Sequence, residues 1–229
     1  NIEDGYFQTK KKLTPAQKED IEKSDVKVYE NFYIEQKLTN GSTIRFFKNR
    51  KEVDKVCLMN GKMPKKSGEI AVDRMYADNN ELKVGDTVKS RKKTFRITGL
   101  VALSDYSALF QNNNDTMFDA VKFGVAIVTD KDFEALNQVK VQYNYAWIYD
   151  KKPATEKKEK KMAEDLMEDM ADVVTIESFV PQYQNQSIHF TGDDMGSDRA
   201  MIVMLLYIVM AILAFVFGIT ISNTIRKEA

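Results

Sequence analysis

The apolar run near the C-terminus is the feature that most constrains what this chain can fold into. From Met201 to Ile221 the sequence reads MIVMLLYIVMAILAFVFGITI, with no charged residue and no Asn, Gln or Pro. As an α-helix this run is about 32 Å long, enough to cross a hydrocarbon core of about 30 Å. A buried helix of a water-soluble protein rarely stays apolar on every face over this length. The sequence therefore predicts one C-terminal transmembrane α-helix over residues 201–225.

The charges beside this run indicate its orientation. Arg226 and Lys227 follow it, whereas Arg199 is the nearest basic residue before it. Basic residues favour the cytoplasmic side of a membrane. We therefore expect residues 226–229 to begin a cytoplasmic segment and residues 1–200 to be extracellular, which places the protein in the cell membrane.

The N-terminus carries neither an initiator Met nor an apolar export signal. A domain that precedes its membrane span needs such a signal to leave the cytoplasm. The sequence is therefore interpreted as a piece of a longer membrane protein whose first span is missing. A cytoplasmic domain with a C-terminal anchor is the alternative.

Three small residues follow one another at four-residue spacing in the predicted span: Ala214, Gly218 and Ser222. Such a stripe allows a second membrane helix to approach closely. The expected partners are the lipid bilayer and other membrane helices, either of the same protein or of a second copy. Small residues scattered in a lone anchor are the alternative interpretation.

Composition excludes several classes of function. Lys and Arg number 34 and Asp and Glu also 34, so the net charge of zero argues against a nucleic-acid partner. One Cys and one His argue against a disulfide framework and against a zinc site. No GxSxG, HExxH or P-loop motif is present. We expect no enzyme, no catalytic residue and no cofactor, and we expect Cys57 to be a small buried side chain between Val56 and Leu58.

Residues 1–180 show alternating helix and strand signals, which predict an α+β extracellular domain with a mixed or antiparallel sheet and short helices. This domain is either a single unit or two subdomains. Helices are expected at Pro15–Lys23, Arg74–Asn80, Lys131–Asn137 and Glu156–Ala171. Strands are expected at Val26–Leu38, Ser42–Phe47, Val53–Met59, Gly68–Asp73, Leu82–Val88, Lys93–Val101, Phe123–Thr129, Val141–Tyr149 and Val173–Ile176. Residues 181–200 are expected to connect this domain to the membrane.

Two segments offer candidate sites. Asp193, Asp194 and Asp198 lie near glycines, and carboxylate oxygens at such turns suit calcium, although their spacing does not match an EF-hand loop. Tyr106 and Phe110 lie in an aromatic-rich connection and are candidates for contact with a partner, because aromatic residues are enriched at interfaces. The alternatives are that the acids only affect solvation or topology and that the aromatic side chains fold back on the core.

The order of several motifs resembles a known family. Gly61-Lys62-Met63-Pro64, Gly68-Glu69-Ile70-Ala71-Val72-Asp73, Leu82-Lys83-Val84-Gly85-Asp86-Thr87-Val88 and Phe95-Arg96-Ile97-Thr98-Gly99-Leu100 precede the apolar run. This arrangement resembles the extracytoplasmic core domain of MacB-type, FtsX-like ABC transporter permeases, and the last residues resemble their second transmembrane helix. The resemblance covers roughly residues 55–105 and 200–229. The composition is similar to that of Gram-positive members.

The resemblance implies a permease subunit without catalytic activity, which works with a separate cytoplasmic ABC ATPase. In that family an outer domain lies between the first two spans, and ATP-driven motion is coupled to efflux or release of hydrophobic or peptide-like substrates. Pro181 stiffens the connection to the span, as a lever requires. A ligand-sensing or cell-wall-hydrolase-regulating ectodomain and a membrane-tethered enzyme remain as alternatives.

Overall fold

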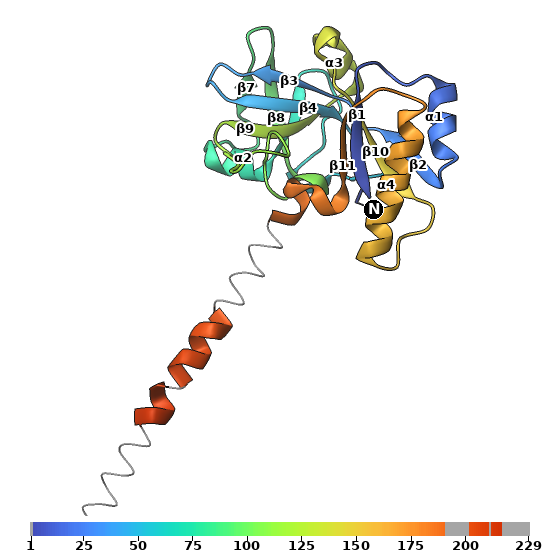
Figure 1. The fold of residues 1–229 in the computed structure, drawn as a ribbon. Coiled ribbons are helices and arrows are strands. Elements are labelled where there is room, and N and C mark those ends of the chain that lie inside the picture. Colours follow the sequence, from blue (N-terminus) through green and yellow to red (C-terminus); the bar gives the residue numbers. More distant parts are fainter. Residues whose placement is uncertain (1, 191–201, 211, 217–229) are drawn as a thin grey trace, which may run out of the picture. The chain divides into compact units, whose positions relative to one another are not determined.

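The computed structural model describes residues 2–190, 202–210 and 212–216. The chain divides into two compact units, Asn1–His189 and Phe190–Ala229. The boundary between the units falls inside the predicted connector of residues 181–200. The first unit contains two β-sheets, each with its own hydrophobic core (Figure 1).

The smaller sheet is entirely antiparallel, with the strand order β11-β1-β10-β2. Its strands are β1 (Gly5–Thr9), β2 (Val26–Glu30), β10 (Tyr143–Tyr149) and β11 (Ile176–Pro181). Two amphipathic helices, α1 (Pro15–Glu22) and α4 (Glu156–Ala171), pack their apolar residues on one face of this sheet. Phe7 of β1 and Trp147 of β10 lie fully buried in the resulting core.

The larger sheet is mixed, with the order β3-β4-β9-β6-β8-β5 and with β7 paired to β8. Its strands are β3 (Tyr33–Lys37), β4 (Thr43–Lys48), β5 (Cys57–Gly61), β6 (Glu69–Asp73), β7 (Thr87–Lys89), β8 (Thr94–Ala102) and β9 (Phe123–Val128). The pairs β4–β9 and β6–β8 are parallel, and the others are antiparallel. Every residue of β9 is buried, as expected for a strand covered on both faces.

Short helices complete the unit. The helices α2 (Arg74–Asn79) and α3 (Asp130–Ala135) contact the larger sheet, α2 at β6, β8 and β9, and α3 at β4. The 3₁₀ helices are η1 (Ser104–Tyr106), η2 (Gln138–Lys140) and η3 (Gln182–Gln184). Thr14 and Gln17 form a capping box at the start of α1, which explains why Pro15 opens this helix.

The α+β class with mixed and antiparallel sheets is confirmed, and helix α4 has the predicted bounds. The segment Val26–Leu38, in contrast, is two strands that belong to different sheets. Asn31 and Phe32 separate them, and Phe32 packs against both hydrophobic cores. The predicted strand at Val173–Ile176 begins only at Ile176 and continues to Pro181, so Pro181 lies in the sheet rather than in a free connector.

The prediction that Cys57 is buried is wrong. Cys57 is exposed, as are all five residues of β5. The apolar letters around Cys57 indicated a core strand, but β5 pairs only with β8, at the edge of the larger sheet. Edge strands bury less of their surface than central ones.

The predicted transmembrane segment lies in the second unit. Residues 202–210 and 212–216 are helical, and their side chains are exposed. Within the part of the chain that the structure describes, no helix is both long enough and apolar enough to cross a membrane. Residues 217–229 lie outside the described part, and the span over 201–225 stays a prediction.

Close packing of Gly5 against Trp147 gives a test of the smaller sheet. A Cβ atom at Gly5 would lie 2.2 Å from Cζ2 of Trp147 and 2.8 Å from the carbonyl oxygen of Val180. Trp147 is held in place by stacking on Phe179, with ring centroids 4.7 Å apart. Gly5→Ala is therefore expected to lower the free energy of unfolding by about 1–3 kcal/mol in urea titrations. Lys27→Ala, on an exposed position of β2, should change it by less than about 0.5 kcal/mol. Equal effects of the two substitutions would contradict this packing argument.

Candidate functional site

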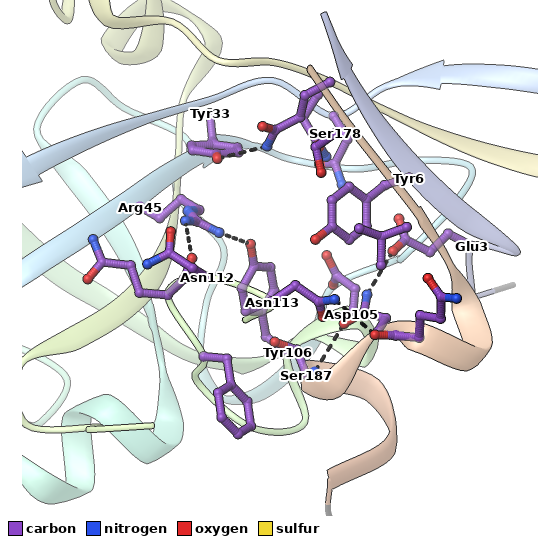
Figure 2. A pocket seen from close by; sticks show the side chains of 18 of the residues that line it. Glu3, Tyr6, Tyr33, Arg45, Asp105, Tyr106, Asn112, Asn113, Ser178 and Ser187 are labelled. Atoms are coloured by element: carbon purple, nitrogen blue, oxygen red, sulfur yellow. Dashed lines mark hydrogen bonds between the residues drawn. The ribbon is translucent and has the colours of Figure 1, made fainter. Parts of the chain in front are cut away.

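A polar cavity of about 360 Å³ lies between the two sheets (Figure 2). Strands β1 and β11 contribute residues from the smaller sheet, and β3 and β4 contribute residues from the larger one. The connection after β8 and the segment after β11 complete the wall. The main polar residues that line it are Glu3, Tyr6, Gln8, Asn31, Tyr33, Arg45, Asp105, Tyr106, Asn112, Asn113, Asn144, Ser178, Asn185 and Ser187.

Strand alternation explains why β1 supplies polar groups to this cavity. Phe7 points into the core of the smaller sheet, so its neighbours Tyr6 and Gln8 point to the opposite face. Gln8 is paired with Asn144 of β10 on one side and with Ser178 of β11 on the other. These residues therefore form a polar row on the sheet face that lines the cavity.

Arg45 of β4 occupies the opposite wall and is 7% exposed. Its guanidinium donates hydrogen bonds to Oε1 of Glu35 at 2.6 and 3.0 Å, to the Tyr106 hydroxyl at 2.6 Å and to the Gln111 carbonyl at 2.7 Å. It also lies 4.1 Å from the centroid of the Tyr33 ring. Arg45 is thus neutralised and held in one orientation by groups of this chain.

A second charged cluster is buried beside the cavity. Nη1 of Arg50 donates to Oδ1 of Asp105 at 2.6 Å, and these side chains are 7% and 4% exposed. The backbone N–H of Glu3 donates to Oδ1 of Asp54 at 2.9 Å. Glu3 and Asp54 are 2% and 1% exposed. One arginine therefore faces three buried carboxyl groups.

This imbalance shifts the acid ionisations. Burial raises the pKa of Glu3 well above its ordinary value of 4.5, and the charges of Asp54 and Asp105 raise it further. Burial and then the charge of Asp105 raise the pKa of Asp54 from 3.8 to about 7. The Arg50 charge lowers the pKa of each carboxyl without cancelling these increases. A proton is thus retained on the Glu3–Asp54 pair near neutral pH.

The residues that follow β11 are bound to the domain. We call residues 182–188 the exit segment. Its backbone N–H at Gln182 donates to the Asp4 carbonyl at 2.9 Å, and Nδ2 of Asn185 donates to Oε1 of Glu3 at 3.1 Å. The hydroxyl of Ser107 donates to the Ser187 carbonyl at 2.5 Å. The exit segment therefore joins the start of the chain to the connection after β8.

Asn113 adds a clamp on the same segment. Its Nδ2 donates to the Gln184 carbonyl at 2.9 Å, and its Oδ1 accepts from the backbone N–H of Gln186 at 3.0 Å. The nitrogen and the oxygen of one side-chain amide therefore both hydrogen-bond to the exit segment and fix the connection after β8 to it.

The two aromatic residues proposed as a partner-contact loop lie in the wall of the cavity. Phe110 is 2% exposed and belongs to the buried core, and Tyr106 binds Arg45 through its hydroxyl. This packing matches the alternative expectation that these rings fold back on the core. A partner contact through them stays a prediction.

The remaining candidates lie in the second unit. Ala214 is exposed on helical residues 212–216. The others lie outside the described residues: Asp193, Asp194, Asp198, Gly218, Ser222, Arg226 and Lys227. Among the residues that the structure does describe, no group of three or more His, Cys, Asp and Glu side chains is arranged to hold a metal ion.

Retention of a proton at Asp54 predicts a pH dependence of stability. The stabilisation from this proton is complete below the Asp54 pKa of 3.8 in the unfolded chain. It is lost as the pH rises through the folded-state pKa of about 7. The free energy of unfolding should therefore contain a contribution that decreases from pH 5 to pH 8. Asp54→Asn, which stays neutral, should make urea titrations less pH-dependent over this range. Asp172→Asn, at the exposed C-cap of α4, should leave the dependence unchanged. An unaltered profile in Asp54→Asn would contradict the proton assignment.

No family model and no curated protein matches the chain. Among solved structures, it is similar to the periplasmic region of MacB from Actinobacillus actinomycetemcomitans, with 14% sequence identity, 76% of this chain and 87% of that chain covered, and a TM-score of 0.37. It is also similar to the extracellular domain of the ABC-type transporter YknZ from Gram-positive bacteria, with 11% identity, 76% and 98% coverage, and a TM-score of 0.35.

Proposed function

We propose that this chain is the outer domain and the following transmembrane helix of an ABC transporter permease subunit. The observation that carries the proposal is the pairing of the first and last strands of the domain. Gly5 of β1 lies opposite Pro181 of β11, so the start of the first strand and the end of the last strand lie side by side.

Adjacent ends suit a domain inserted between two membrane helices. Packed helices lie about 8–10 Å apart, and neighbouring strands lie about 4.8 Å apart. The ends of β1 and β11 are therefore closer together than the axes of two packed spans, and short connections are enough to join them to such a pair. A domain with distant ends would need long linkers, which transmit little force.

The exit segment suits the transmission of motion. Residues 182–188 are hydrogen-bonded to Glu3, to Asp4 and to the connection around Ser107 and Asn113. Movement of a helix that follows this segment would act on both sheets rather than on a loose tether. In this proposal a separate cytoplasmic ATPase supplies the energy, the chain itself is not catalytic, and the transporter exports or releases a hydrophobic or peptide-like substrate.

A ligand-sensing ectodomain is the second candidate. The polar cavity between the sheets favours it, because a concave site of this size suits a small ligand. Both candidates place residues 1–200 outside the cell, and they differ in the requirement for an ATPase.

The location is tested with the native thiol of Cys57, which is exposed. A membrane-impermeant maleimide is expected to label Cys57 on intact cells, because the proposal places β5 outside. Cys57→Ser should abolish labelling. In that background, Lys227→Cys should react only after the membrane is permeabilised. Labelling of Cys57 that also requires permeabilisation would rule out an extracellular domain.

The coupling to an ATPase is tested with the full-length protein purified from membranes. An ATPase subunit is expected to copurify and to hydrolyse ATP, whereas the sensing alternative predicts no such subunit.

Gly218→Leu should disrupt close helix packing and abolish ATP-driven transport, while the domain keeps its melting temperature. Ile212→Leu, which keeps the apolar character, is the matched control. Full transport by Gly218→Leu would contradict the helix-packing proposal.

A further inference from the structure

Two buried amide side chains lack hydrogen bonds that their burial calls for. Asn31 and Asn144 are each 7% exposed, and within the described chain neither Oδ1 atom has a hydrogen-bond partner. The two residues are neighbours, since the backbone N–H of Asn31 donates to the Asn144 carbonyl at 2.8 Å. Each unsatisfied group costs about 1–3 kcal/mol. Such a cost at two adjacent residues of one cavity is typical of a binding site rather than of a scaffold.

Tyr6 presents a third polar group to the same space. Its hydroxyl points into the cavity (Figure 2). Tyr6 lies opposite Ala146, and Gln8 lies opposite Asn144, so Tyr6 and Asn144 are diagonal neighbours on one face of the β1–β10 pair. Burial raises the pKa of Tyr6 above its ordinary value, so this hydroxyl remains a donor at neutral pH.

Both arginines at the cavity are already paired. Arg45 is bound to Glu35, and Arg50 is bound to Asp105. An anionic ligand would therefore lose its hydration without gaining a free counter-charge. An uncharged ligand with both a donor and an acceptor fits the groups that remain.

We propose that the cavity binds a small uncharged ligand through a secondary amide. The ligand carbonyl accepts from the Tyr6 hydroxyl. The Asn144 amide oxygen is buried, so the carboxamide turns over to present this oxygen to the ligand N–H, with Asn31 beside it. The volume of about 360 Å³ admits one sugar or a short peptide. N-acetylated sugars and peptides both carry this amide.

The proposal does not rest on the transporter function, because it concerns only residues of the first unit. Ligand binding is measured on the 229-residue chain in detergent, without an ATPase. The probes are N-acetylglucosamine and N-acetylalanine amide, and each is titrated while the melting temperature is followed. At least one of them is expected to raise it in a saturable manner, and the stronger one identifies the source of the amide. Glucose and acetate, which lack the amide, should not.

Asn144→Leu separates binding from folding. Leu has the same branched shape without the unsatisfied polar atom, so the variant is expected to melt at a higher temperature and to lose the response to the amide probe. A merely structural asparagine would instead be destabilised by this change. Asn79→Leu, on the exposed surface of α2, is the matched control and should keep the response.

Tyr6→Phe provides a second variant that keeps the fold. Loss of one neutral hydrogen bond should weaken probe binding about threefold to tenfold. The proposal is overturned if neither amide probe raises the melting temperature of the unmodified chain, or if Asn144→Leu and Tyr6→Phe both bind the probe with unchanged affinity.

Discussion

The pairing of β1 with two strands at once is the constraint on which the rest of the structure depends. β1 has only five residues, and β10 and β11 flank it on both sides. Its inward side chain Phe7 fixes the core of the smaller sheet, and its opposite face forms one wall of the cavity. A shift of one residue in its register would exchange these two faces. The register of one short strand therefore determines both the core and the site.

Charge burial shows two different outcomes in the same region. Arg45 is compensated by Glu35, Tyr106 and Gln111, so its burial costs little. Arg50 has fewer hydrogen-bond partners, and among the described residues no group accepts a hydrogen bond from its Nε or Nη2 atom. The surplus of carboxyl groups there is balanced by retention of a proton rather than by a second cation. Retention of this proton reduces the negative charge buried beside the cavity.

Local elements were predictable because their signals lie close together in the chain. Thr14 and Pro15 predict the start of α1, and the spacing of Met162, Leu166 and Met170 predicts α4. The cavity was not predictable, because it depends on contacts between residues far apart, such as Glu3 with Asn185 and Gln8 with Asn144. Asn31 within an otherwise β-rich segment was the one local sign. It interrupts Val26–Leu38 where the chain crosses from one sheet to the other.

The cavity and the exit segment share residues, and this sharing has a thermodynamic consequence. Asn185 and Ser187 line the cavity and also hold the segment to Glu3 and Ser107. A ligand that fills the cavity contacts a wall that exists only while the exit segment is bound. The ligand therefore has a higher affinity for the form in which the exit segment is attached to the domain, and ligand binding shifts the equilibrium toward that form. By reciprocity, detachment of the exit segment from the domain lowers the affinity for the ligand by the same factor. Release of a ligand and motion of the chain after β11 are then two sides of one equilibrium.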